Sequence, residues 1–116
     1  MEIPKYTGNL IARAKDVSVA REMFTTAFAY KEEGKNRFVQ ANSKPFLFIH
    51  PEKHEKNSIE PVFSVNHLKV FLKDIESKGF KAVDQPKRIE GIGTIARILG
   101  FQGTTLTLME EELDEE

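Results

Sequence analysis

The order of apolar patterns along the chain repeats once, and this duplication limits the possible folds more than any other feature of the sequence. Each half contains an alternating segment typical of a strand, then a helical pattern, then short strand-like segments. The first half predicts a strand at 9–15 and a helix from 19 to about 30, with Asp16 or Ser18 as the N-cap. The second half predicts a strand at 61–66 and a helix that begins at Asn66 or His67 and ends at Lys78-Gly79.

Three short strands are expected after each helix, separated by turn residues. In the first half they lie within 31–36, at 37–41 and at 45–50. In the second half they lie at 80–83, 94–99 and 104–109. The sequence therefore predicts two copies of one strand–helix–three-strand module.

Residues 51–59 separate the two halves, and they are polar without any apolar period. We expect one domain that covers 1–116, with a first module at about 8–50, a linker at 51–59 and a second module at about 60–110. Six of the seven residues in 110–116 are acidic, which predicts a solvated tail.

Cysteine is absent from the 116 residues, which excludes a disulfide scaffold, a thiolate metal site and a cysteine nucleophile. No segment reaches the roughly eighteen apolar residues of a membrane-spanning helix, and the N-terminus lacks the apolar region of a signal peptide. Without the acidic tail, 17 basic residues face 12 acidic ones, but the basic residues are scattered and not interleaved with aromatic ones. We expect a cytoplasmic protein that binds neither nucleic acid nor a membrane.

Each module would place one helix against a four-stranded sheet, and one helix can cover only one face of it. The other face must be buried against something or remain reachable from solvent. Two modules side by side would form a curved mixed sheet with the helices outside and a central cup inside. The sequence therefore predicts an α+β fold, with a small-molecule site in the cup.

Five short motifs carry a family resemblance, and they are matched in the order in which they occur. Residues 15–17 (KDV) and 20–24 (AREMF) match an aspartate followed by A-x-x-F-Y. Three further segments are similar to motifs in the second half. Residues 63–68 (FSVNHL) are similar to F-x-V-D-D-L, and residues 75–80 (IESKGF) to L-x-x-x-G-V. Residues 100–108 (GFQGTTLTL) are similar to D-P-x-G-N-x-x-E-L. In this respect the chain resembles the vicinal oxygen chelate superfamily, which includes glyoxalases, bleomycin-resistance proteins and extradiol dioxygenases. The resemblance covers residues 8–110.

The resemblance implies metal-ligand positions in the first and last strands of each half. Carried over, these positions hold Asn9, Phe48, Glu60 and Thr107, and only Glu60 offers a strong ligand. We therefore expect no metal and no cofactor. His50 and His54 are four residues apart, but Pro51 and the polar residues around them favour a loop over a helical metal pair.

The family's inward-facing parity also assigns side chains to the two faces of the sheet, and a slip of one residue would exchange the faces. Residues expected beneath the helices are Leu10, Ala12, Leu47, Ile49, Phe63, Val65, Leu106 and Leu108. Residues expected to bind a ligand in the cup are Asn9, Arg13, Phe46, Phe48, His50, Glu60, Thr107 and Met109. Glu60 and His50 are the candidates for acid or base catalysis. Arg13 and Glu60 can instead form an ion pair with each other. The sequence leaves open which face of the sheet the side chain of Arg97 occupies.

The interpretation we favour is a glyoxalase- or bleomycin-resistance-like protein that is metal-independent and binds a small, largely apolar or aromatic molecule. One alternative is a metal-dependent lyase or dioxygenase of the same superfamily, so the sequence leaves enzymatic activity open. Another is a ferredoxin-like regulatory or RNA-binding domain, which needs one strand after the second helix where three are expected. The resemblance further implies a homodimer.

Overall fold

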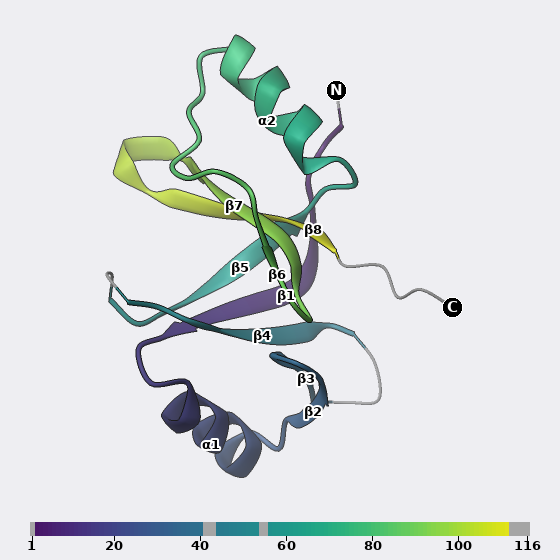
Figure 1. The fold of residues 1–116 in the computed structure, drawn as a ribbon, viewed down its shortest axis with the longest axis vertical. Coiled ribbons are helices and arrows are strands. Elements are labelled where there is room, and N and C mark those ends of the chain that lie inside the picture. Colours follow the sequence, from purple (N-terminus) through teal and green to yellow (C-terminus); the bar gives the residue numbers. More distant parts are fainter. Residues whose placement is uncertain (1, 41–43, 54–55, 112–116) are drawn as a thin grey trace. The chain divides into compact units, whose positions relative to one another are not determined.

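A computed structural model describes residues 2–40, 44–53 and 56–111 of the chain. The chain forms two compact units (Figure 1). We call Gly8–Pro61 the first unit, and Met1–Thr7 together with Val62–Glu116 the second unit. In the described residues the order strand–helix–three strands occurs twice, so the predicted α+β duplication is confirmed.

The first unit contains a helix and a mixed sheet. Its elements are β1 (Lys5–Ala14), α1 (Val17–Ala27), β2 (Lys31–Gly34), β3 (Arg37–Val39) and β4 (Phe46–Pro51). The hydrogen-bonded order of the strands is β2-β3-β4-β1. β1 and β4 run parallel, and β3 is antiparallel to both β2 and β4.

The second unit repeats this arrangement. Its elements are β5 (Ser58–Ser64), α2 (Leu68–Ser77), β6 (Lys87–Ile89), β7 (Gly93–Leu99), the 3-10 turn η1 (Phe101–Gly103) and β8 (Thr105–Glu111). The strand order is β5-β8-β7-β6, with β5 parallel to β8 and the other pairs antiparallel. β1 and β5 each contribute residues to both units.

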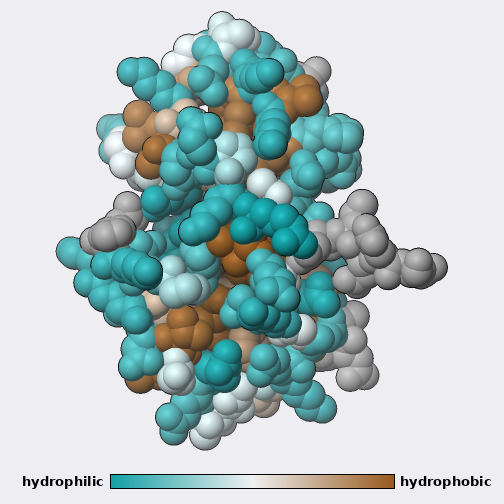
Figure 2. Space-filling model, viewed as in Figure 1, coloured by the Kyte–Doolittle hydropathy of each residue, from teal (hydrophilic) through white to brown (hydrophobic). Residues whose placement is uncertain are grey.

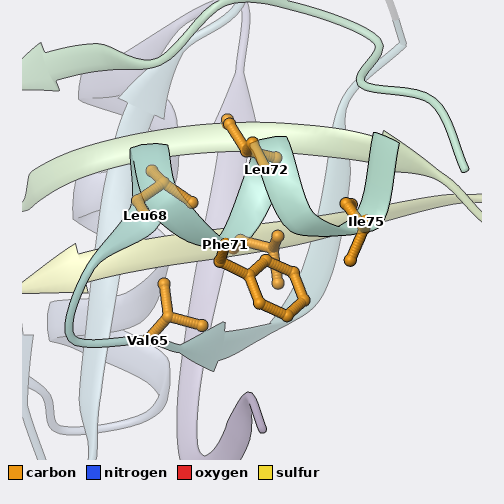
Figure 3. Close-up of a cluster of buried hydrophobic side chains, with 7 residues drawn as sticks. Val65, Leu68, Phe71, Leu72 and Ile75 are labelled. Atoms are coloured by element: carbon orange, nitrogen blue, oxygen red, sulfur yellow. The ribbon is translucent and has the colours of Figure 1, made fainter. Parts of the chain in front are cut away.

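Each unit has its own apolar core between its helix and one face of its sheet. In the first unit Leu10, Val17, Ala20, Phe24 and Tyr30 pack on four buried residues, which are Ala12, Phe38, Leu47 and Ile49. In the second unit the buried residues are Val65, Leu68, Phe71, Leu72, Ile75, Ala96 and Leu108, and α2 turns its apolar side chains toward the strands (Figure 3). The strand residues predicted to lie beneath the helices are confirmed for Leu10, Ala12, Leu47, Ile49, Phe63, Val65 and Leu108.

Helix α1 begins at Val17, two residues before the predicted start, because Asp16 is the N-cap. Its carboxylate accepts hydrogen bonds from the backbone N–H of Ser18 at 3.0 Å and of Val19 at 3.3 Å. The helix ends at Ala27, earlier than the predicted end near residue 30, because Ala29 has a positive φ of 58° that turns the chain out of the helix. Of the two N-caps that the sequence allowed, Asp16 is confirmed.

Two expected strand boundaries are wrong. Residues 80–83 do not form a strand: Ala82 makes only an isolated bridge to Ile98, and the strand of this hairpin is β6 instead. The pairing of this segment with β7 ends at Asp84. The side chain of Asp84 accepts a hydrogen bond from the backbone N–H of Arg97 at 2.8 Å, where a strand would have offered a backbone carbonyl. β5 begins at Ser58, inside the expected linker, where Pro61 obscures the alternating pattern.

At the C-terminus, Glu110 and Glu111 belong to β8, and the rest of the expected tail lies outside the described residues.

Apolar residues also remain on the surface. Figure 2 shows them (brown) in separate patches among hydrophilic residues (teal). The large ones that are exposed include Val19 and Met23 on α1, Val70 on α2, and Phe101 in η1. None of the described helices is long and apolar enough to cross a membrane.

The N-terminus of α2 is held by carboxylates from outside the helix. His67, the N-cap, makes no side-chain capping bond. Glu2 accepts hydrogen bonds from the backbone N–H groups of Asn66 and His67, and Glu110 accepts one from Leu68 at 2.9 Å. These bonds satisfy backbone donors that a helix leaves unpaired and place negative charge at the positive end of its dipole.

Substituting Glu110→Ala is therefore expected to lower the free energy of unfolding by about 1 kcal/mol, as the loss of an N-cap does. Urea denaturation followed by circular dichroism would measure the change. Glu76→Ala, on the exposed side of the same helix, is the control and is expected to change it by less than about 0.5 kcal/mol. Equal effects of the two substitutions would contradict a capping role for Glu110.

Candidate functional site

The first unit leaves one face of its sheet without a helix, and most of the predicted ligand-binding residues lie on that face. In the parallel pair β1–β4, Ile11 lies opposite Phe48, and Arg13 lies opposite His50. Residues of the other parity, such as Leu47, pack beneath α1. Because side chains alternate along a strand, Asn9, Arg13, Phe46, Phe48 and His50 share the face away from the helix. We call it the open face of the first unit, by which we mean only that no described helix packs on it, because Asn9, Arg13 and Phe48 on this face are buried.

Asn9 is completely buried on the open face, and its side chain holds the neighbouring strand. The amide oxygen of Asn9 accepts a hydrogen bond from the backbone N–H of Phe46 at 2.9 Å. Phe46 is the first residue of β4, so this bond fixes where β4 begins beside β1. A buried amide engaged with the backbone has a structural role, and its oxygen is already used by the protein.

Arg13 lies on the same face and is 6% exposed, with carboxylates on two sides. Its Nε donates to Oε1 of Glu60 at 3.4 Å, and its Nη1 lies 3.9 Å from Oε1 of Glu52. The other oxygen of Glu60 accepts a hydrogen bond from the hydroxyl of Ser58 at 3.3 Å. The structure therefore brings Arg13 and Glu60 together as an ion pair, which was one of the two alternatives for these residues.

Two phenylalanine rings lie on the same face as this ion pair. The ring centroids of Phe46 and Phe48 are 5.8 Å apart with an interplanar angle of 52°. Phe48 is buried, whereas Phe46 is half-buried and keeps part of its ring at the surface. The guanidinium carbon of Arg37 lies 5.0 Å from the centroid of the Phe46 ring, and Nζ of Lys44 lies 5.7 Å from it. This ring is therefore the centre of a positively charged aromatic surface.

His50 is half-buried at the end of β4, opposite Arg13 in the strand register. With Glu60, it is one of the two residues that the sequence predicted as candidates for acid or base chemistry. His54, the other half of the considered histidine pair, lies outside the described residues.

The remaining two predicted ligand residues lie in the second unit, on the face of its sheet away from α2. Thr107 and Met109 are buried, and they lie opposite Val62 and Ser64 of β5. Arg97 lies opposite Thr107 in the β7–β8 pair, so its side chain shares that face, and the question the sequence left open is answered. The Nε of Arg97 donates to a carboxylate oxygen of Asp84 at 3.0 Å.

Sequence reasoning missed two functional candidates on the open face, Arg37 and Glu52. Arg37 lies opposite Phe48 across the antiparallel pair β3–β4, so it belongs to the same face as the two rings. Only the hairpin register gives this placement, and the alternation within 37–41 was its single signal in the sequence. Glu52 follows β4 directly, and its backbone N–H donates to the carbonyl oxygen of Ala14 at 2.9 Å, which brings its carboxylate near Arg13.

The four positions at which the resemblance places metal ligands can be judged from their surroundings. Glu60 is engaged by Arg13 and Ser58, Asn9 by the backbone of Phe46, and Phe48 has no donor atom. In the part of the chain that the structure describes, no group of three or more histidine, aspartate or glutamate side chains is placed to hold a metal ion. The donor set in these positions does not fit a transition metal.

Comparison with solved structures places the whole arrangement among known folds. No protein-family model and no curated protein sequence matches the chain. A hypothetical protein from Bacillus halodurans C-125 superposes with a TM-score of 0.66 at 12% identity over 99% of both chains. Methylmalonyl-CoA epimerase from Mycobacterium tuberculosis gives a TM-score of 0.67 at 13% identity over 97% of this chain and 94% of that one.

A third neighbour, a variant of homoprotocatechuate 2,3-dioxygenase from B. fuscum, gives a TM-score of 0.59 at 13% identity, over 97% of this chain and 34% of that one. The epimerase and the dioxygenase are both vicinal oxygen chelate proteins. This chain has the vicinal oxygen chelate fold. The predicted family resemblance is confirmed at the level of the fold, and identities of 12% and 13% establish nothing finer. Because the vicinal oxygen chelate fold serves an epimerase and a dioxygenase alike, the fold does not choose the reaction.

Proposed function

We propose that this protein binds a small, largely apolar or aromatic molecule without a metal ion, as a bleomycin-resistance-like member of its fold group. The observation that carries the proposal is the pair of Phe46 and Phe48 rings on the open face, with Phe46 half-buried and reachable. The buried polar side chains on the same face, Asn9 and Arg13, are occupied by protein partners. An aromatic surface next to satisfied polar groups suits a flat apolar ligand.

The charge arrangement supports binding without a metal. Glu60 is the single strong ligand among the four implied positions, and its carboxylate forms an ion pair with Arg13. A cation at Glu60 would have to displace that guanidinium and would find no second carboxylate or imidazole ligand among the three other positions. The predicted cup and any catalytic use of Glu60 and His50 remain predictions of the sequence.

Titration with benzamide, a neutral aromatic probe, tests the proposed surface. We expect changes in the backbone NMR signals of residues 46–50, and we expect Phe46→Ala to weaken binding about fivefold or more because the reachable ring is lost. Phe101→Ala, which removes a ring that is 71% exposed in the other unit, is the matched control and is expected to leave binding unchanged. Signal changes confined to other strands would contradict the proposal.

Metal independence has its own test. Extensive dialysis against EDTA is expected to leave the dissociation constant for benzamide unchanged, and elemental analysis is expected to find no stoichiometric zinc, iron or manganese. The structural reason is that Glu60 is already paired with Arg13. Stoichiometric metal that disappears in Glu60→Gln would overturn this part of the proposal and favour the metal-dependent alternative.

The proposal includes the homodimer that the family resemblance implies and the cytoplasmic location that the sequence features predict. Sedimentation equilibrium is expected to give a mass of twice 13.2 kDa. A monomer at concentrations of about 100 μM would contradict the dimer, because obligate interfaces hold well below that concentration.

A further inference from the structure

Arg37 lies in an unusual position on the open face of the first unit. Its guanidinium lies over the Phe46 ring, with 5.0 Å between the guanidinium carbon and the ring centroid. It also lies close to the backbone of Gly34, its partner in the β2–β3 pair. A Cβ atom added at Gly34 would lie 3.1 Å from Nη2 and 3.3 Å from Nε of Arg37. The absence of a side chain at residue 34 therefore leaves the room in which the guanidinium lies.

The charge of Arg37 has no counter-charge within the part of the chain that the structure describes. Among the described residues Arg37 forms no ion pair with aspartate or glutamate, and its buried Nε has no hydrogen-bond partner. The other two arginines on helix-free sheet faces differ: Arg13 is paired with Glu60, and Arg97 with Asp84. A guanidinium is a planar fork of donors, and burying part of it without an acceptor costs free energy. Such a group is suited to an acceptor that arrives from outside.

The surroundings of Arg37 set the kind of ligand it can take. Phe46 and Phe48 supply the apolar surface, and Lys44 adds a second cation 5.7 Å from the centre of the Phe46 ring. A flat molecule against Phe46 would bring a substituent at its edge to the guanidinium. The stacked arginine is held in place before binding, so little side-chain freedom is lost when it donates to an anion.

We propose that Arg37 binds the anionic group of the ligand, so that the molecule bound on the open face is a small aromatic or flat apolar acid. The terminal nitrogens of Arg37 donate to the oxygens of a carboxylate or phosphate group, while the apolar body lies against Phe46. This inference rests on the proposed binding function and adds to it the charge and the chemical class of the ligand.

Three probes with the same ring test the inference: benzoate, phenyl phosphate and neutral benzamide. We expect the wild-type protein to bind at least one of the two anions about tenfold tighter than benzamide, with a preference that weakens as salt is raised. The anion that binds tighter assigns the carboxylate or the phosphate class. Equal binding of all three probes would overturn the role of Arg37 and would leave the proposed function intact, whereas no binding of any probe would overturn both.

Arg37→Met keeps an apolar stem and removes the guanidinium, so it is expected to abolish the preference for the anion and to leave benzamide binding within about twofold. Arg37→Lys, which keeps the charge without the planar fork, is expected to retain part of the preference and serves as the second variant if the methionine protein folds poorly. Arg88→Met, which removes an exposed cation from the second unit, is the control and is expected to keep the full preference. An unchanged preference in Arg37→Met would contradict the proposal.

Discussion

Methionine in place of Arg13 is expected to lower the free energy of unfolding by about 3 kcal/mol, a large share of the stability of a small protein. The side chain of Arg13 is 6% exposed, while those of Glu60 and Glu52 are 25% and 12% exposed. Removing the cation leaves two poorly hydrated carboxylates that repel each other. The partial exposure of Glu60 gives its charge some access to water, which keeps the expected loss at the lower end for broken buried pairs.

Urea denaturation followed by circular dichroism would measure this loss, with Arg88→Met as the control for removal of an exposed cation. The double variant Arg13→Met with Glu60→Gln is expected to recover about 1 kcal/mol, because the neutral amide no longer needs a counter-charge. A stability of Arg13→Met equal to that of the wild type would show that the ion pair does not hold the strands. Arg13 would then be available to a ligand, as the sequence first suggested.

Arg13 and Arg37 lie on the same face of the sheet, and the stability of the Arg13 variant shows whether the two residues have different roles. Arg13 is neutralised by its own protein, and its substitution should change stability first and ligand binding only as a consequence. Arg37 has no carboxylate partner among the described residues, and its substitution should change the preference for an anion with a smaller effect on stability. The two variants therefore separate a structural arginine from a binding arginine on the same sheet face.

Much of the fold follows from local periodicity in the sequence. Alternation in β1 and β4 grouped Leu10, Ala12, Leu47 and Ile49 on one face, and the family resemblance placed that face beneath the helix, as the core of the first unit confirms. Such patterns depend only on which residues are apolar, so they persist when identity to other chains falls to 12%. This is why motifs that are individually weak could still indicate the correct fold.

The errors have a different physical origin. The strand expected at 80–83 has the right apolar residues, but Asp84 takes the backbone donor that would have extended the pairing. Helix α1 ends early because Ala29 adopts a left-handed conformation that nothing in its side chain requires. Neither feature changes the spacing of the apolar residues, so periodicity alone could not predict them.

For the candidate site, the face of the sheet that each residue occupies was predictable, but the residues that it contacts were not. The sequence placed Asn9 and Arg13 correctly among the strand positions of one parity, yet their engagement with Phe46 and Glu60 depends on how strands far apart in the sequence are aligned. Arg37 was missed for the same reason, because its guanidinium lies next to Gly34 and over the ring of Phe46, which belong to two other strands. Contacts between strands require the register, which the sequence does not state directly.

Alanine in place of Phe38 is expected to cost about 3–5 kcal/mol of unfolding free energy, the range for truncating a buried phenylalanine. Phe38 is 0% exposed and lies with Leu47 and Ile49 in the core of the first unit, opposite Leu47 in the β3–β4 pair. The lost ring removes apolar burial and leaves a cavity that fixed strands cannot close. Urea denaturation would measure the cost.

Phe101→Ala is the matched control, because that ring is 71% exposed and its removal is expected to change stability by less than about 0.5 kcal/mol. The comparison also bears on the binding face. Phe38 and Arg37 are adjacent in β3 and point to opposite sides of the sheet, so Phe38→Ala weakens the core while Arg37→Met alters the open face. If Phe38→Ala cost less than about 1 kcal/mol, the core would not hold β3 in its register, and the placement of Arg37 beside Phe46 would fail with it.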